Sequence, residues 1–297
     1  MAVGTSSARL DATTVESKHR SEIQNAWRRF STNRVALVGL AMLALILLIA
    51  ILAPVIAPYD PINDMDTARR GCPPSPEHWF GCDHLGRDLL SRVIYGARIA
   101  LTVGIGATLI SVTIGVVVGA LAGFLGGWTD AILSRLVDTL MSFPIIALLI
   151  VLAAVLGPSL LTTVVVIGVT VWSRYARVVR ADVMSLRERD FIVAAYASGV
   201  RNWRIIWRHL VPNALGPVIV LASLGIGGII ILEAALSFLG LGVRPPAPSW
   251  GAILADGRAY ILRYPHISFF PGVMIVFTVL AFNFVGDGLR DALDPKE

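Results

Sequence analysis

The sequence contains few charged residues and almost no lysine. Only 15% of its 297 residues are Asp, Glu, Lys or Arg, whereas 56% are hydrophobic. A soluble domain keeps about a quarter of its residues charged, so this balance indicates that lipid surrounds much of the chain. Lys18 and Lys296 are the only lysines. The lysine of a G-x-x-x-x-G-K-[ST] phosphate-binding loop is therefore missing, which excludes an ATP-driven motor of that kind within the chain.

Catalytic and ion-coupling groups are also scarce. The sequence has no H-E-x-x-H or G-x-S-x-G motif, and its apolar runs hold almost no ionisable residue except Glu233. A proton- or sodium-coupled carrier keeps such groups at mid-membrane. We therefore expect no catalytic site and no cofactor bound by this chain. It is either a passive channel, or a partner supplies the energy.

Long apolar runs predict an all-α membrane protein with six transmembrane helices. A span needs about 20 apolar residues. The first run, 35–58, is too long and too late for a cleaved leader, so we interpret it as an anchor after a partly disordered tail, 1–34. The apolar run 139–173 is long enough for two helices. They separate at Gly157–Ser159, because Pro cannot continue a helix interior. The other expected helices cover 99–129, about 131–156, 160–173, a stretch beginning at Pro212, and 267–285.

Arginine placement predicts the orientation. The net charge of +5 is concentrated in the tail 1–34 and the loop 174–211, so it indicates topology rather than binding to nucleic acid. Both segments are expected in the cytoplasm, together with the C-terminal tail 291–297. The loop 59–98 then lies outside, and the core 99–290 holds the remaining helices. These features predict a multi-pass protein of a bacterial inner membrane.

The external loop contains both cysteines of the chain. Cys72 and Cys82 lie where thiols can oxidise, and we hypothesise a disulfide between them. His78 and His84 are close in sequence, but their spacing matches no common zinc pattern, so we expect no metal site.

The cytoplasmic loop is more elaborate than a connector needs to be. Ser185 and Glu188 have capping-box spacing, which predicts a helix from there to Gly199, a residue suited to a left-handed cap. A second short helix is expected after Asn202, followed by the next span at Pro212. The loop is either a surface helix pair lying on lipid headgroups or an element that docks into a cytoplasmic partner.

Several motifs resemble those of a known family. Ala194-Ala195-x-x-x-Gly199, with Pro212 thirteen residues later, resembles the "EAA" coupling loop of bacterial ABC-importer permeases. An ordered set resembles the dipeptide/oligopeptide permeases, and specifically the second permease of the pair, over roughly residues 25–297. The set comprises Phe80–Asp88, Ser91-Arg92, Tyr95–Arg98, Leu186–Asp190, Glu233–Gly242, Pro248–Gly251 and Asn283–Pro295.

The resemblance implies the fold of a type I importer permease and a set of partners. These are a homologous permease subunit forming a heterodimer, two ATPase domains that hold ATP and Mg, an external substrate-binding protein and a peptide cargo. It also implies ATPase-coupling residues in the loop 185–211, namely Asp190, Val193, Ala194, Ala195, Tyr196, Gly199 and Pro212.

Two positions carry separate expectations. Val193 replaces the glutamate that the family has before Ala-Ala, so the contact there is more apolar, or Asp190 or Glu188 supplies the charge. Glu233 is a candidate for the translocation path or its gate, and otherwise a helix-end group with a local partner. The alternatives for the whole chain are the same machinery importing nickel chelates, haem or other small cargo, or a self-contained channel or gradient-driven carrier.

Overall fold

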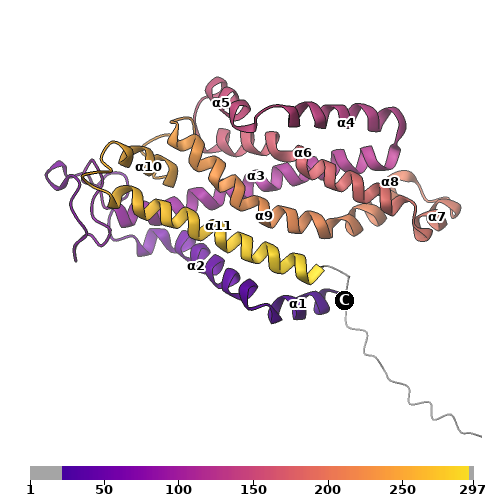
Figure 1. Ribbon diagram of the computed structural model, residues 1–297, viewed down its shortest axis with the longest axis horizontal. Helices are drawn as coiled ribbons and strands as arrows, with labels where there is room; N and C mark the ends of the chain where they lie inside the picture. Colours follow the sequence, from indigo (N-terminus) through magenta and orange to yellow (C-terminus); the bar gives the residue numbers. More distant parts are fainter. Residues whose placement is uncertain (1–21, 294–297) are drawn as a thin grey trace, which may run out of the picture.

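Residues 22–293 are described by a computed structural model, which folds them into a bundle of long helices (Figure 1). This part of the chain contains no β-strand, and its extended pairing is one isolated bridge between Cys82 and Asp88. The all-helical class predicted from the sequence is confirmed. The helices are α1 (Glu22–Thr32), α2 (Arg34–Ile56), η1 (Thr67–Arg69), α3 (Leu89–Leu125), α4 (Gly127–Ser142), α5 (Ile145–Leu156), α6 (Leu160–Arg187), α7 (Asp190–Ala197), α8 (Asn202–Ile205), η2 (Ile206–Leu210), α9 (Val211–Phe238), α10 (Trp250–Arg258) and α11 (His266–Leu293).

The first helices begin at side-chain caps. Asn33 Oδ1 accepts hydrogen bonds from the backbone N–H groups of Val35 and Ala36, which starts α2. The 23 residues of α2 then bear no charge after Arg34. The expected disorder of the N-terminal tail concerns residues 1–21, which lie outside the described residues, and the next eleven residues form α1. The expected tail 291–297 is described only to Leu293, within α11.

Four helical segments in the described range are long and apolar enough to cross a membrane: α2, α3, the run from α8 through α9, and α11. The pair α4 and α5 forms a fifth if it is taken as one broken span, with a bend of 90° between the two helices. The sequence predicted one unbroken helix over about 131–156, and the structure corrects this. Pro144 lacks an N–H and disfavours a helical residue before it, and Phe143 is extended (φ −83°, ψ 139°).

Close packing of α3 on α6 forms the centre of the bundle. Gly115, Gly119 and Gly123 face α6 so tightly that an added Cβ would lie 2.5–2.7 Å from atoms of that helix. Small residues let membrane helices approach until their backbones touch, and these three glycines permit that approach here. Ser111 Oγ adds a hydrogen bond to the Gly168 carbonyl oxygen at 2.8 Å.

The bundle has two distinct ends (Figure 1). The α10 end, on the left of the view, contains α10, residues 57–88 and the turn between α5 and α6. The α7 end, on the right, contains α7 and α8. The helix α6 continues to Arg187 and therefore reaches the α7 end as one unbroken element. The predicted helix start at Ser185 was wrong, because Ser185 lies inside the last turns of α6 and α7 begins only at Asp190.

Candidate functional site

The turn at the end of α7 is built around Gly199. Its φ of +73° is the left-handed conformation that glycine adopts without a steric penalty. The Gly199 N–H donates to the Tyr196 carbonyl oxygen and the Val200 N–H to the Ala195 carbonyl oxygen, at 3.0 and 3.1 Å. This pair of bonds is a Schellman motif, which ends α7 and fixes the direction of the chain that follows.

The helix α7 presents most of its side chains to the outside. Only Ile192 is buried, with 0% exposure, while Val193 and Tyr196 are 56% and 41% exposed. Asp190 and Ala194 are also exposed, and Ala195 is half-buried against the core. The structure therefore brings most of the predicted coupling residues onto one projecting element.

Contacts with α3 and α6 hold α7 in place. The Tyr196 ring stacks on Phe124, near the end of α3, with ring centroids 6.0 Å apart. Arg187, the last residue of α6, donates from Nη1 to the Phe124 carbonyl oxygen at 3.0 Å. These contacts connect α7 to the ends of the tightly packed α3–α6 pair.

The segment after Gly199 forms one continuous helical run from Asn202 to Phe238. Within it, Ile206–Leu210 is a π-helical turn, and the Val211 N–H bonds the Ile206 carbonyl oxygen. Pro212 sits in the first turn of α9 without interrupting the run. The sequence predicted a separate short helix capped by Asn202. The structure corrects this, because Asn202 is the first helical residue and the cap position is Arg201.

Glu233 lies inside the protein near the α10 end. It is 1% exposed, and Ser237 Oγ donates to its Oε1 at 2.7 Å. Ser249, which caps α10, also bonds the Glu233 carboxylate. Beside it, Trp250 is fully buried, and its Nε1 donates to the Val93 carbonyl oxygen on α3 at 2.9 Å. Glu233 therefore connects α9 to the start of α10 in this structure.

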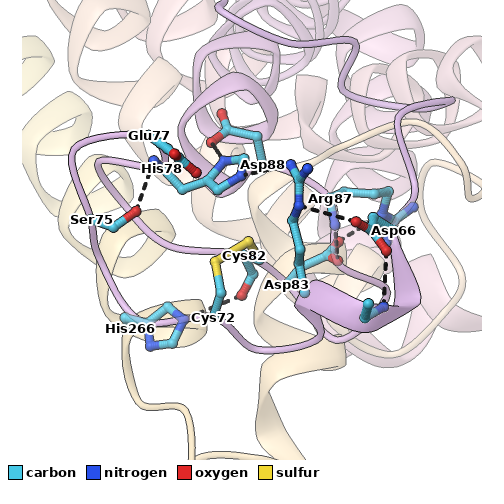
Figure 2. Close-up of a disulfide and its surroundings, with 12 residues drawn as sticks. Asp66, Cys72, Ser75, Glu77, His78, Cys82, Asp83, Arg87, Asp88 and His266 are labelled. Carbon is cyan, nitrogen blue, oxygen red and sulfur yellow. Dashed lines mark hydrogen bonds and ion pairs between the residues drawn. A yellow bond between two sulfur atoms is a disulfide. The ribbon is translucent and has the colours of Figure 1, made fainter.

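A disulfide joins Cys72 to Cys82 in the segment between α2 and α3 (Figure 2). The loop it closes lies against α11, where His266 Nε2 is 3.2 Å from the Cys82 carbonyl oxygen. Gly81, with φ +77°, leaves no room for a Cβ, which would lie 2.5 Å from the Cys72 carbonyl oxygen. Turn geometry and the covalent bond together fix the shape of this loop, and His266 connects it to the helical bundle.

Buried ion pairs lie beside the disulfide (Figure 2). Asp83 accepts from Arg87 Nε at 2.7 Å and lies 3.3 Å from Arg92 Nε, and the three side chains are 2–5% exposed. Asp256 of α10 approaches Arg87 at 3.9 Å. Burial raises the pKa of the Asp256 carboxyl above its ordinary value, and the charges of His84, Arg92 and Arg87 act against this shift.

The two external histidines face different carboxylates. His78 Nδ1 lies 2.9 Å from Asp88 Oδ1, and His84 Nδ1 lies 3.8 Å from Asp256 Oδ2. Within residues 22–293 no three His, Cys, Asp or Glu side chains gather as metal ligands would. His84 thus joins the network of Arg87 and Arg92 through Asp256, whereas His78 pairs separately with Asp88. Sequence reasoning missed this network, although the i, i+4 spacing of Asp83 and Arg87 was a usable signal.

Comparison with known proteins places the chain in a family. Residues 115–297 match the model of the "binding-protein-dependent transport system inner membrane component". Residues 21–74 match the "N-terminal TM domain of oligopeptide transport permease C". The chain belongs to this family of inner-membrane permeases. It is therefore a multi-pass inner-membrane protein and a permease subunit of an ABC transporter, a kind of subunit that is not itself catalytic.

Curated relatives cover nearly the whole permease. The dipeptide transport system permease protein DppC of Alkalihalophilus pseudofirmus is 44% identical over 273 residues, covering 92% of this chain and 90% of the relative. The glutathione transport system permease protein GsiD of Escherichia coli O157:H7 is 43% identical, covering 91% and 89%. The GsiD of Pectobacterium atrosepticum is 42% identical, covering 93% and 92%.

A solved structure supports the permease fold. A chain of the inward-facing MetNI methionine ABC transporter superposes with a TM-score of 0.57, covering 69% of this chain and 98% of that chain. The sequence identity is 21%, so the likeness concerns the fold alone. The type I importer architecture implied by the sequence motifs is confirmed at this level.

Proposed function

We propose that this chain is one of two permease subunits of an ATP-driven importer of di- and oligopeptides. The observation that carries the proposal is the projecting α7, whose Gly199 turn leads directly into the continuous run Asn202–Phe238. A displacement of α7 by a partner is passed to α9 without an intervening flexible loop. The relatives named for dipeptide and glutathione transport support peptides as the cargo class.

The membrane arrangement in this proposal has six spans: α2, α3, the bent pair α4–α5, α6, α9 and α11. The α7 end and both termini face the cytoplasm, and the α10 end faces outward. Arginine placement supports this orientation, since Arg201, Arg204 and Arg208 cluster at the α7 end. A cysteine replacing Pro158, in the turn between α5 and α6, is then labelled by an impermeant maleimide from outside. A cysteine replacing Arg201 is labelled only after permeabilisation. Labelling of both positions from the same side would show that α6 does not cross the membrane.

The partners are a homologous permease subunit, two cytoplasmic ATPases that hold ATP and Mg²⁺, and an external binding protein that delivers the peptide. Closure and opening of the ATPases move α7, and the permease pair alternates between outward-open and inward-open states. Glu233 acts at the opposite end of α9, where its carboxylate connects the helix to α10 on the gate side. The exposed residues Asp190, Val193, Ala194 and Tyr196 form the ATPase contact, and Ala195, Gly199 and Pro212 shape it.

The test is purification of the tagged chain from native membranes after crosslinking, followed by mass spectrometry and an uptake assay. A co-purified second permease and ATPases, with ATP-dependent uptake of peptides into proteoliposomes, support the proposal. ATP-dependent uptake of nickel chelates or haem instead of peptides supports the ATP-driven importer but contradicts peptides as its cargo. Recovery of the chain alone or only as a homo-oligomer contradicts the proposal and favours a self-contained channel.

A further inference from the structure

A cavity of about 380 Å³ lies between α5, α6 and α9. Its volume is within the range of small-molecule sites. Helix α9 forms most of its wall and contributes two glycines, Gly225 and Gly228. A Cβ added at Gly228 would meet nothing within 4 Å, so at that position α9 faces open space.

The cavity wall is apolar except for two neighbouring residues of α6. Tyr175 is 2% exposed, and its hydroxyl lies against Gly225. Arg174 brings a guanidinium to the same wall. The other residues that line the cavity are aliphatic or glycine, so its polar chemistry comes from Arg174 and Tyr175.

Arg174 differs from the other arginines of α6. Arg177 Nη2 donates to Asp138 at 2.8 Å, and Arg180 makes two bonds to Asp130. Arg187 bonds the Phe124 carbonyl oxygen. Among residues 22–293, Arg174 has no hydrogen-bond or ion-pair partner, and its side chain is exposed.

The position of Arg174 along α6 makes this lack of a partner informative. It is 14 residues from Leu160 and 13 from Arg187, or roughly 20 Å from each end at 1.5 Å per residue. In the proposed arrangement Leu160 lies at the outer end of this span, so a charge about 20 Å further along the helix is still within a hydrocarbon core about 30 Å thick. A charge at that depth is costly in lipid, so such side chains face a water-filled cavity or a partner of opposite charge. At about 100° per residue, Arg174 is turned by about 120° from Arg180, away from the acidic residues of α4.

We propose that Arg174 binds the C-terminal carboxylate of the peptide cargo as it passes through this cavity. A guanidinium binds a carboxylate through two parallel hydrogen bonds. Every linear peptide has this group whatever its side chains, so one such contact serves a mixed cargo. The inference rests on the proposed function, since it requires peptides to cross between α6 and α9.

The test uses the complete transporter in proteoliposomes and one tripeptide in two forms, with a free C-terminal carboxylate and with a C-terminal amide. The binding protein is saturated with each form, and its loading is measured separately, so that differences in uptake arise in the membrane. The wild type is expected to transport the free form at least about tenfold faster than the amide. Arg174→Gln is expected to slow the free form to the amide rate and to leave the amide rate unchanged.

Two further variants control for folding and for charge. Arg177→Gln removes an arginine that pairs with Asp138 and does not line this cavity, so the ratio of the two rates stays at the wild-type value. Arg174→Lys keeps the charge without the planar fork, and an intermediate ratio is expected. If Arg174→Gln reduces the yield of assembled complex, the ratio of free-form to amide uptake measured with Arg174→Lys tests the inference instead.

Three outcomes overturn the inference. Equal uptake rates for the free and amidated tripeptide in the wild type show that the permease does not recognise the C-terminal carboxylate. An equal loss of both rates in Arg174→Gln assigns the residue to the fold or to an acidic residue of the partner permease. Unchanged rates in that variant leave Arg174 without a role in transport. A wild-type complex that transports neither form contradicts the proposed function itself, which distinguishes the two failures.

Discussion

The two ends of the bundle are held by different kinds of contact. At the α10 end, a disulfide and the buried ion pairs around Asp83 hold the external segment together, and the hydrogen bond from Trp250 to Val93 joins two parts of the chain that are far apart in sequence. At the α7 end, one buried side chain, Ile192, and one ring stack hold α7 against the bundle. The first end has the contacts of a fixed scaffold. The second leaves a projecting surface for another protein to cover.

This difference indicates where the molecule can change shape. Segments with few buried contacts open at low free-energy cost, whereas those with many stay closed until the whole protein unfolds. Because α9 runs between the two ends, the proposed function expects it to stay fixed near Glu233 and to move near Pro212 when a partner displaces α7. Loss of the α7 geometry should therefore stop transport without unfolding the protein, and loss of a contact at the α10 end should destabilise the fold.

The largest effect is expected from Gly199→Pro. Proline fixes φ near −65°, whereas Gly199 has φ +73° and donates a hydrogen bond through its N–H. We expect ATP-dependent peptide uptake to fall at least about tenfold, a barrier change of about 1.4 kcal/mol or more. The amount of protein in the membrane, measured by immunoblot, stays at the wild-type level. Ser198→Ala is the control because it keeps the turn, and normal uptake by the proline variant would contradict the role of α7.

Asp83→Asn is expected to destabilise the α10 end. The change removes the charge that faces Arg87 and Arg92 and leaves both guanidinium groups buried. Breaking a buried pair in this way costs about 3–5 kcal/mol of unfolding free energy. Denaturant unfolding of the purified protein measures the loss. The matched control is Asp66→Asn, whose pair with Arg69 is exposed and contributes less than about 1 kcal/mol. Equal losses in the two variants would remove the distinction between buried and exposed pairs.

Replacing both Cys72 and Cys82 with serine tests the covalent part of the same end. A cross-link separated by 10 residues restricts the unfolded chain by about 3 kcal/mol in the loop-entropy description. We expect the variant to unfold at lower denaturant concentration, and the reduced wild type to behave like the variant. If reduction destabilises the variant as much as the wild type, the effect does not come from this disulfide.

The smallest effect is expected from Val193→Glu. Val193 is 56% exposed on α7, where a surface ion pair with a basic residue of the ATPase contributes about 1 kcal/mol or less. The affinity for the ATPase, measured by titration, should rise by no more than about fivefold and should lose this gain in high salt. Val193→Gln has the same shape without the charge and should bind like the wild type. A tenfold weakening by Val193→Glu would instead show that the ATPase buries this position in an apolar contact.

Features set by a single residue type were predictable from the sequence. A left-handed turn suits glycine, so the position of Gly199 was enough to predict where α7 ends. The charge-free run of α2 was predictable for a similar reason, because its composition alone marks it as a span. In each case the local chemistry of the chain decides the outcome.

Features that depend on several elements were not predictable. Pro144 lies inside an apolar run, and membrane helices often tolerate a proline at such a position. Whether the chain bends there depends on how α5 packs on α6. The continuity of α8 with α9 was hidden because Pro212 suits the start of a helix as well as its early interior. Ser249, which bonds Glu233, and Asp130, which pairs with Arg180, lie far from them in sequence, so sequence spacing could not identify these two partners.

The glycine face of α3 has a consequence for biogenesis. During synthesis α3 enters the bilayer before α6 exists, because α4 and α5 lie between them in the chain. Until α6 arrives, Gly115, Gly119 and Gly123 present a notched surface that lipid chains cannot fill as closely as a helix does. Insertion of α6 therefore completes the nascent permease core, and a chain that stops at α5 lacks the partner its central helix is shaped to receive.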